Sequence, residues 1–337
     1  MNWRRTAVWA ASLLLFIFVW SLIPWDDLRQ VGSILSFWSL AALFLFDIVI
    51  VLSMSGRWWF ILRGLGYPVN YFQLSGYRLA AFGISYFTPG PQFGGEPLQV
   101  WVLKSKHHIP SGSALASVTV DKLIELFVNF TILALGGIVV VQQALISNDS
   151  AGWLLITSLL LWLLPALLLF WMGKGLAPLT HGYCWLVQRP IFDRLAQRYQ
   201  ARLQQIEATI VESEVQVAAL WQNAPGALWA AFFVSLLTWV LWFVEFWLMY
   251  FLLGLTLDMT QLLIVVTAVR LAFLMPLPAG LGTLEASQYV AMAALGQATA
   301  IGLSATVFIR VRDFLLAGIG LWLSGRLIRQ SSKGVPV

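Results

Sequence analysis

Two apolar stretches of this chain are interrupted by the same kind of loop, rich in proline and glycine and ending in a glutamate. Residues 89–96 read PGPQFGGE and residues 278–285 read PAGLGTLE, so a proline stands seven positions before Glu96 and before Glu285. An arginine leads into each loop, in RLAAF from Arg78 and in RLAF from Arg270. Two copies of one pattern predict an internal repeat built around these loops.

The solvent around the chain follows from its composition. Hydrophobic residues make up 60% of the sequence and charged residues only 10%, with a mean hydropathy of +0.81. A soluble domain needs roughly a quarter of its residues charged to cover its surface, so the sequence predicts an integral membrane protein. The net charge of +5 is modest and favours anionic lipid surfaces over nucleic acid as a partner. The lone Cys184 excludes an internal disulfide and a cysteine-based metal cluster.

The apolar runs predict an all-α polytopic membrane fold, in one integral membrane domain over residues 1–337. About 20 helical residues are needed to cross the hydrocarbon layer, and six runs come near or exceed that length: 7–24, 34–56, 114–141, 152–172, 227–252 and 302–325. Residues 74–88 and 260–275 are too short, and the loops then break them. These two stretches predict re-entrant helical hairpins, over 74–104 and 260–298.

Lysine and arginine give an expected orientation, because cations collect on the cytoplasmic side of a membrane. With both termini in the cytoplasm, Arg29 is the one flanking cation left on the far side. The hairpins then enter from opposite sides, which predicts an inverted repeat of residues 34–141 and 227–327 in the cell (inner, cytoplasmic) membrane. The polar segment 173–226 between them carries an amphipathic helix over 192–210, which we expect to lie along the membrane surface.

The two loops predict a polar cavity inside the membrane. Irregular backbone at membrane depth is tolerated only where protein or water covers it, and helices starting near Glu96 and Glu285 direct unpaired N–H groups into that space. Arg78 and Arg270 add full charges, which suit a phosphate or a carboxylate. A lipid head group presents such a group at this depth. The predicted substrate-binding residues are Arg78, Pro89, Gly90, Gly94, Gly95, Glu96, Asp121, Glu125, Arg270, Pro278, Gly280, Gly282, Glu285, Arg310, Arg312 and Asp313.

Structural alternatives to these assignments stay open at the level of sequence. A glutamate in the first turn of a helix also caps that helix. Arg78 and Arg270 have the loop glutamates as ion-pair partners, or else Asp47 and Glu245. The charged groups of the long spans, Asp121 with Glu125 and Arg310 with Asp313, either brace the bundle or carry protons or ligand. No metal site is expected at His107 and His108, because no third ligand stands at suitable spacing.

Several of these residues carry a resemblance to a known family. Pro89 and Glu96 with DKL at 121–123, followed by Pro278-x-Gly280-x-Gly282-x-x-Glu285, resemble the flippase-like membrane family that includes the membrane portion of lysylphosphatidylglycerol synthases and UPF0104-type membrane proteins. The similarity runs from about residue 10 to 327. It departs at Gln92 and Gln99, where the family pattern has cationic residues. The resemblance implies a helical bundle that binds or moves an anionic or polyprenyl-linked lipid between leaflets.

Three classes of function are consistent with these patterns, and a lipid translocase is the leading one. The second is an intramembrane transferase acting on a lipid-linked donor, for which Asp121 and Glu125 are the available acid pair. The third is a proton-coupled transporter of a small soluble anion. We expect no catalytic residues, no cofactor and no synthase activity, since no aminoacyltransferase domain follows Val337. A homo-oligomer is left open.

Overall fold

The computed structural model describes residues 37–88, 94–145, 148–189, 199–275 and 277–332. Within these ranges the chain is helical and contains no strand, which confirms the all-α prediction. The helices are α3 (Phe37–Gly64), α4 (Tyr71–Phe87), α5 (Glu96–His107), α6 (Ser111–Gln142), α7 (Asn148–Gly173), α8 (Pro178–Val187), α10 (Gln200–Asn223), α11 (Pro225–Leu252), α12 (Met259–Leu274), α13 (Thr283–Ala294) and α14 (Thr299–Ser332). A short 3₁₀ turn, Pro278–Gly280, lies between α12 and α13.

Four helices are long and apolar enough to cross a membrane by their length and composition. These segments are Ala41–Gly64, Ser111–Gln142, Gly152–Gly173 and Pro225–Leu252, and they match four of the six predicted spans. The sixth predicted span falls within α14, which has 34 residues but carries Arg310, Arg312 and Asp313 along its length. The first predicted span, 7–24, lies outside the described residues.

The two predicted hairpins are pairs of short helices separated by the loops. Asn70 begins α4 by accepting hydrogen bonds from the backbone N–H groups of Phe72 and Gln73, at 3.0 and 3.3 Å. Gly95 ends the first loop where a Cβ atom would stand 2.2 Å from the carbonyl oxygen of Ala81, so only glycine fits between α4 and α5. An Asp258–Gln261 capping box begins α12 in the second hairpin.

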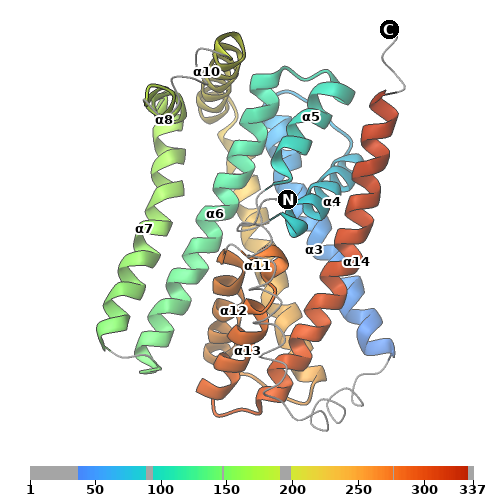
Figure 1. The fold of residues 1–337 in the computed structure, drawn as a ribbon, viewed down its shortest axis with the longest axis vertical. Helices are drawn as coiled ribbons and strands as arrows, with labels where there is room; N and C mark the ends of the chain where they lie inside the picture. The colour runs from blue at the N-terminus through green and yellow to red at the C-terminus, as the bar shows by residue number, and fades with distance from the viewer. Residues whose placement is uncertain (1–36, 89–93, 146–147, 190–198, 276, 333–337) are drawn as a thin grey trace.

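Each hairpin packs against the last long helix of the other half of the chain. Helix α4 packs along α14, helix α12 packs along α6, and α3 packs along α11. Glycines permit these close crossings, because a Cβ on Gly320 would lie 2.1 Å from the carbonyl oxygen of Leu79 and one on Gly136 would lie 1.7 Å from Oγ1 of Thr267. Figure 1 shows α4 and α5 in the upper half of the molecule and α12 and α13 in the lower half.

In its described part, the polar segment between the halves forms two helices at one end of the molecule. Helices α8 and α10 lie together at the top left of Figure 1, where α10 also packs against α6 and α7. Glu214 of α10 ties them together, since its carboxylate accepts the N–H groups of Leu179 and Thr180 at 2.7 and 3.2 Å. The predicted amphipathic helix over 192–210 overlaps α10 from residue 200 on, and its first part falls mostly in 190–198, outside the described residues.

Candidate functional site

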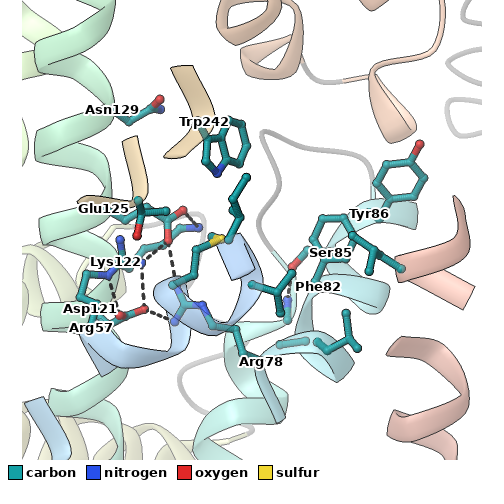
Figure 2. Close-up of a pocket in the computed structure, with 18 of the residues that line it drawn as sticks. Arg57, Arg78, Phe82, Ser85, Tyr86, Asp121, Lys122, Glu125, Asn129 and Trp242 are labelled. Carbon is teal, nitrogen blue, oxygen red and sulfur yellow. Dashed lines mark hydrogen bonds and ion pairs between the residues drawn. The ribbon is translucent and has the colours of Figure 1, made fainter. Parts of the chain in front are cut away.

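A cavity of about 200 Å³ lies between the two halves of the chain. Its walls come from α3, α4, α5, α6, α11, α12 and α14, and Figure 2 shows the part formed by the α4 and α6 side chains together with Trp242. Charged side chains are unusually dense for a space inside an apolar bundle. They are Asp47, Arg57, Arg78, Glu96, Asp121, Lys122, Glu125, Glu245, Arg270, Arg312 and Asp313.

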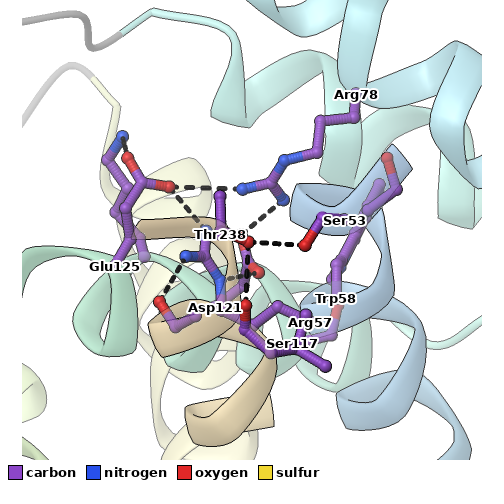
Figure 3. A network of polar contacts seen from close by, with 12 residues as sticks. Ser53, Arg57, Trp58, Arg78, Ser117, Asp121, Glu125 and Thr238 are labelled. Atoms are coloured by element: carbon purple, nitrogen blue, oxygen red, sulfur yellow. Dashed lines mark hydrogen bonds and ion pairs between the residues drawn. The ribbon is translucent and has the colours of Figure 1, made fainter. Parts of the chain in front are cut away.

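Six of these residues form an ion-pair network that we call the α6 cluster: Arg57, Arg78, Glu96, Asp121, Lys122 and Glu125. Arg57 of α3 and Arg78 of α4 reach the same two carboxylates of α6, as Figure 3 shows. Arg57 lies 2.7 Å from Asp121 and 2.6 Å from Glu125, and Arg78 lies 2.7 and 3.2 Å from them. Asp121 and Glu125 stand one helical turn apart, so both carboxylates project from one face of α6.

Lys122 extends the α6 cluster to the first loop. Its ammonium group lies 3.1 Å from Glu125 and 3.4 Å from Glu96. The carboxylate of Glu96 in turn accepts the backbone N–H of Gly94 at 2.8 Å. Glu96 therefore binds a backbone N–H group just before its own helix, as the capping alternative predicts. It also lines the cavity. The cluster holds three cations and three carboxylates, so its formal charge is zero.

The second loop is held by one buried ion pair. Glu285 is fully buried, and its two oxygens accept from Nε and Nη2 of Arg310 at 2.8 and 3.0 Å. The same guanidinium donates to the backbone carbonyls of Ala279 and Gly280, and Glu285 accepts the N–H of Gly282 at 2.9 Å. Every group in this arrangement has a partner. It braces the loop and leaves no polar atom of the pair open to a ligand.

Three carboxylates converge on Arg312 in what we call the α14 cluster: Asp47, Glu245, Arg312 and Asp313. The Nη1 nitrogen of Arg312 donates both to Asp47 of α3, at 3.3 Å, and to Glu245 of α11. Its Nε donates to Asp313 at 2.9 Å. All four side chains are buried and line the cavity. In contrast to the α6 cluster, this group has more carboxylates than cations.

Arg270 is placed differently from every other cation that lines the cavity. Among the described residues it makes no ion pair, and its guanidinium carbon lies 3.4 Å from the ring centre of Trp242 and 4.6 Å from that of Trp239. The Nε atom is buried and has no hydrogen-bond acceptor in the described chain. Two neighbours on the cavity wall share this state, the indole N–H of Trp242 and the side-chain oxygen of Asn129. Neither partner suggested for Arg270 by the sequence, Glu285 or Glu245, forms an ion pair with it.

The family model described as "Lysylphosphatidylglycerol synthase TM region" matches residues 8–320. The chain belongs to this family. It is similar to the UPF0104 membrane protein MJ1595 of Methanocaldococcus jannaschii, with 24% identity over 300 residues that cover 85% of this chain and 84% of that protein. No solved structure matches it. The family supports a role connected with membrane lipids and agrees with the resemblance drawn from the two loop motifs.

Half of the predicted substrate-binding residues line the cavity: Arg78, Gly95, Glu96, Asp121, Glu125, Arg270, Arg312 and Asp313. Gly94, Pro278, Gly280, Gly282, Glu285 and Arg310 lie outside its wall and build the loops instead. Pro89 and Gly90 lie outside the described residues. The site prediction therefore separates into a group that faces the cavity and a group that shapes the backbone behind it.

Sequence patterns missed three kinds of residue in this site. Arg57 follows an apolar run and was expected to face the cytoplasm, but α3 continues to Gly64 and places Arg57 inside the α6 cluster, 3% exposed. Trp239 and Trp242 lie in the apolar run 227–252 and were not among the predicted site residues, but they flank Arg270. Asn129 carries no sequence signal beyond being a polar residue one turn after Glu125.

Proposed function

We propose that this protein is a lipid translocase that binds an anionic or phosphate-linked head group in the cavity and moves it between leaflets. The single observation that carries the proposal is Arg270. A cation inside an apolar bundle is unfavourable unless an anion or a set of acceptors compensates it. Arg270 has two aromatic faces and no ion-pair partner in the described chain, so the position is suited to an anion supplied by a ligand.

The chemistry around Arg270 favours a phosphate. A guanidinium offers two parallel N–H donors that match two oxygens of a phosphate or carboxylate, and the unpartnered indole N–H of Trp242 is a third donor on the same wall. The rings of Trp239 and Trp242 keep the guanidinium positioned while its edge stays available. Donors of this kind recognise the charged group and leave the rest of the ligand unspecified.

The arrangement of helices supports movement between two sides. The contacts of α4 with α14 and of α12 with α6 are equivalent under exchange of the two halves, and α3 and α11 contact each other across the same exchange. This pattern supports the proposed inverted repeat, with the two hairpins entering from opposite faces as re-entrant elements. Inverted repeats around a central site are the usual structural basis of alternating access.

The size of the cavity is consistent with two kinds of ligand. A space of about 200 Å³ holds a phosphate-bearing head group but not acyl chains, so a lipid substrate keeps its chains in the bilayer between helices. The same volume suits a small soluble anion, which makes an anion transporter the second candidate. The family favours the lipid, because its name refers to the membrane region of enzymes that make a phospholipid.

The first test is to identify the lipids that co-purify with the gently solubilised protein by mass spectrometry, for wild type, Arg270→Gln and Arg63→Gln. Arg63 is the matched control because its guanidinium also stacks on a tryptophan, 4.2 Å from the ring centre of Trp59, yet it is exposed and lies outside the cavity. We expect one anionic lipid to be enriched in wild type and Arg63→Gln. Arg270→Gln should lower that enrichment about tenfold, because a charge-assisted hydrogen bond contributes about 1.5–3 kcal/mol.

Reconstitution then tests transport. In vesicles that contain the enriched lipid with a fluorescent label on one chain, wild type and Arg63→Gln should speed exchange between leaflets and Arg270→Gln should not. A wild-type lipid profile equal to that of the bulk membrane would contradict a stable head-group site. If inorganic phosphate nevertheless binds wild type and not Arg270→Gln, the soluble-anion candidate replaces the lipid.

A further inference from the structure

The α14 cluster contains a pair of carboxylates that share one hydrogen-bond donor. Asp47 Oδ1 and Glu245 Oε1 both accept from the Nη1 nitrogen of Arg312, although they come from helices α3 and α11. The remaining oxygens, Asp47 Oδ2 and Glu245 Oε2, are buried and have no donor among the described residues. The two carboxylates therefore meet at one guanidinium nitrogen. They are 4% and 2% exposed, so solvent does not substitute for the missing donor.

Charge counting identifies what is missing. Asp47, Glu245 and Asp313 supply three negative charges, and Arg312 supplies one positive charge. Arg270 is the other cation near these carboxylates, within electrostatic range of Arg312, Glu245 and Asp313 and also of Glu125, which is already balanced in the α6 cluster. Three carboxylates against two guanidinium groups leave one negative charge, whereas the α6 cluster has none. A net charge inside an apolar bundle is strongly unfavourable, and one proton removes it.

A proton is the cation that this pair can accept. A proton on either carboxyl group removes the surplus charge and turns an acceptor oxygen into an O–H donor, at a place where two buried oxygens have no donor. An ammonium group is too large to reach oxygens that are closed off in this way. In the described part of the chain, no group of three His, Cys, Asp or Glu side chains is arranged to hold a metal ion.

We infer that Asp47 and Glu245 bind one proton between them and that this proton is coupled to the occupation of Arg270 by an anion. The inference rests on the proposed function. When a phosphate pairs with Arg270, the carboxylates lose the stabilising field of that cation, and their affinity for the proton rises. By thermodynamic linkage the proton strengthens anion binding to the same degree, so the head group enters the cavity together with one proton.

Other charged groups near the pair either have partners or act through Arg270. The neighbouring helices carry the following groups: Arg57 on α3, Arg78 and Tyr86 on α4, Glu125 on α6, Arg270 on α12, and Arg310, Arg312 and Asp313 on α14. Arg57, Arg78 and Lys122 are balanced by Glu96, Asp121 and Glu125 in the α6 cluster. Arg310 is paired with Glu285. Glu125 is held by three cations, whereas Glu245 keeps a buried oxygen without a donor, so an anion on Arg270 acts on the charge state of the Asp47–Glu245 pair.

The test measures binding of a short-chain phosphatidylglycerol to the full-length detergent-solubilised protein at several values between about pH 6 and pH 8. The phosphodiester keeps a single negative charge over this range, so any pH dependence comes from the protein. Wild type should bind more tightly as the pH falls, by several-fold and at most about tenfold per pH unit for one coupled proton. Glu245→Gln and Asp47→Asn imitate the protonated pair and should bind with little pH dependence.

Glu214→Gln is the matched control. Glu214 is a buried carboxylate with its own hydrogen-bond donors, but it lies between α8 and α10, outside the cavity. This variant should keep the wild-type pH dependence. Tight binding by wild type without any change with pH would overturn the proton site while leaving the proposed function intact, and so would a full pH dependence in both Glu245→Gln and Asp47→Asn.

A second readout does not depend on the ligand. Infrared difference spectra of the protein, recorded as the pH is changed, should contain the carbonyl band of one protonated carboxylic acid. Glu245→Gln and Asp47→Asn should each remove that band, and Glu214→Gln should keep it. If phosphatidylglycerol fails to bind wild type but the band is present, the proton site stands and the proposed head-group site fails. Absence of the band in wild type would overturn the proton site directly.

Discussion

The α6 cluster and the α14 cluster occupy the same cavity but balance their charges differently. In the α6 cluster, Arg57 and Arg78 each contact both carboxylates of α6, and three cations face three carboxylates. In the α14 cluster a single guanidinium, that of Arg312, serves three carboxylates. The α6 cluster is therefore electrically neutral by itself. The α14 cluster becomes neutral only when Arg270 and the proposed proton are counted with it.

The two loops show a related contrast. Glu285 is completely buried and bound by two guanidinium nitrogens of Arg310, while the side chain of Glu96 is 26% exposed and lies 3.4 Å from a lysine. Both accept a backbone N–H group of their loop. The second loop is therefore the more rigidly held of the two, and the first loop is the one whose glutamate remains in contact with the cavity.

The largest predicted effect comes from replacing one aspartate with asparagine in each of the two clusters. Asp121→Asn removes a charge that Arg57 and Arg78 share, and we expect it to lower the free energy of unfolding by about 3–5 kcal/mol, the usual loss when a buried ion pair is broken. Asp313→Asn removes a surplus charge instead and should change stability by less than about 1 kcal/mol. Equilibrium unfolding in mixed micelles measures both, and equal losses would show that the clusters do not differ.

A smaller effect is expected from the loop glutamates. Glu285→Gln leaves Arg310 with only neutral acceptors in a buried site, so we expect a loss of about 2–3 kcal/mol. Glu96→Gln should lower stability by less than about 1 kcal/mol, because Glu96 is partly exposed and its lysine partner keeps Glu125. The thermal midpoints of the two purified variants give the comparison, and a larger loss for Glu96→Gln would reverse the assignment of the rigid loop.

The smallest effect concerns the wall beside Arg270. Trp242→Phe keeps an aromatic face for the guanidinium and removes only the unpartnered indole N–H. We expect phosphatidylglycerol binding to weaken by about threefold to tenfold, which corresponds to one hydrogen bond of about 1 kcal/mol, with an unchanged thermal midpoint. Trp247→Phe is the control, since Trp247 is exposed and stacks on Phe251 outside the cavity. Equal weakening in both variants would remove Trp242 from the site.

Much of the fold could be predicted from the sequence because its signals are local. Apolar length gave the positions of α3, α6, α7 and α11, and the loops of proline and glycine located the breaks between α4 and α5 and between α12 and α13. Helix α8 was not predicted, because ten residues within a polar interval carry too little periodicity to separate them from a loop.

The site could be predicted only in part, because pairing depends on how helices cross. Arg78 and Arg270 occupy equivalent places in the sequence, yet one meets two carboxylates and the other meets two indole rings. Nothing within either RLA segment distinguishes them. The partners lie on other helices, α6 for Arg78 and α11 for Arg270, and become neighbours only when the helices within each half pack.

The packing of α4 on α14 also sets an order for making the protein. Lys106 donates to Gln330 at 2.8 Å, and Arg310 reaches the hydroxyl of Tyr86 at 3.4 Å, across 224 residues in each case. At roughly 5–20 residues per second of synthesis, the first hairpin is made on the order of ten seconds or more before the helix that covers it. During biogenesis the first hairpin is thus an unfinished surface, and a chain cut short before α14 would leave it uncovered.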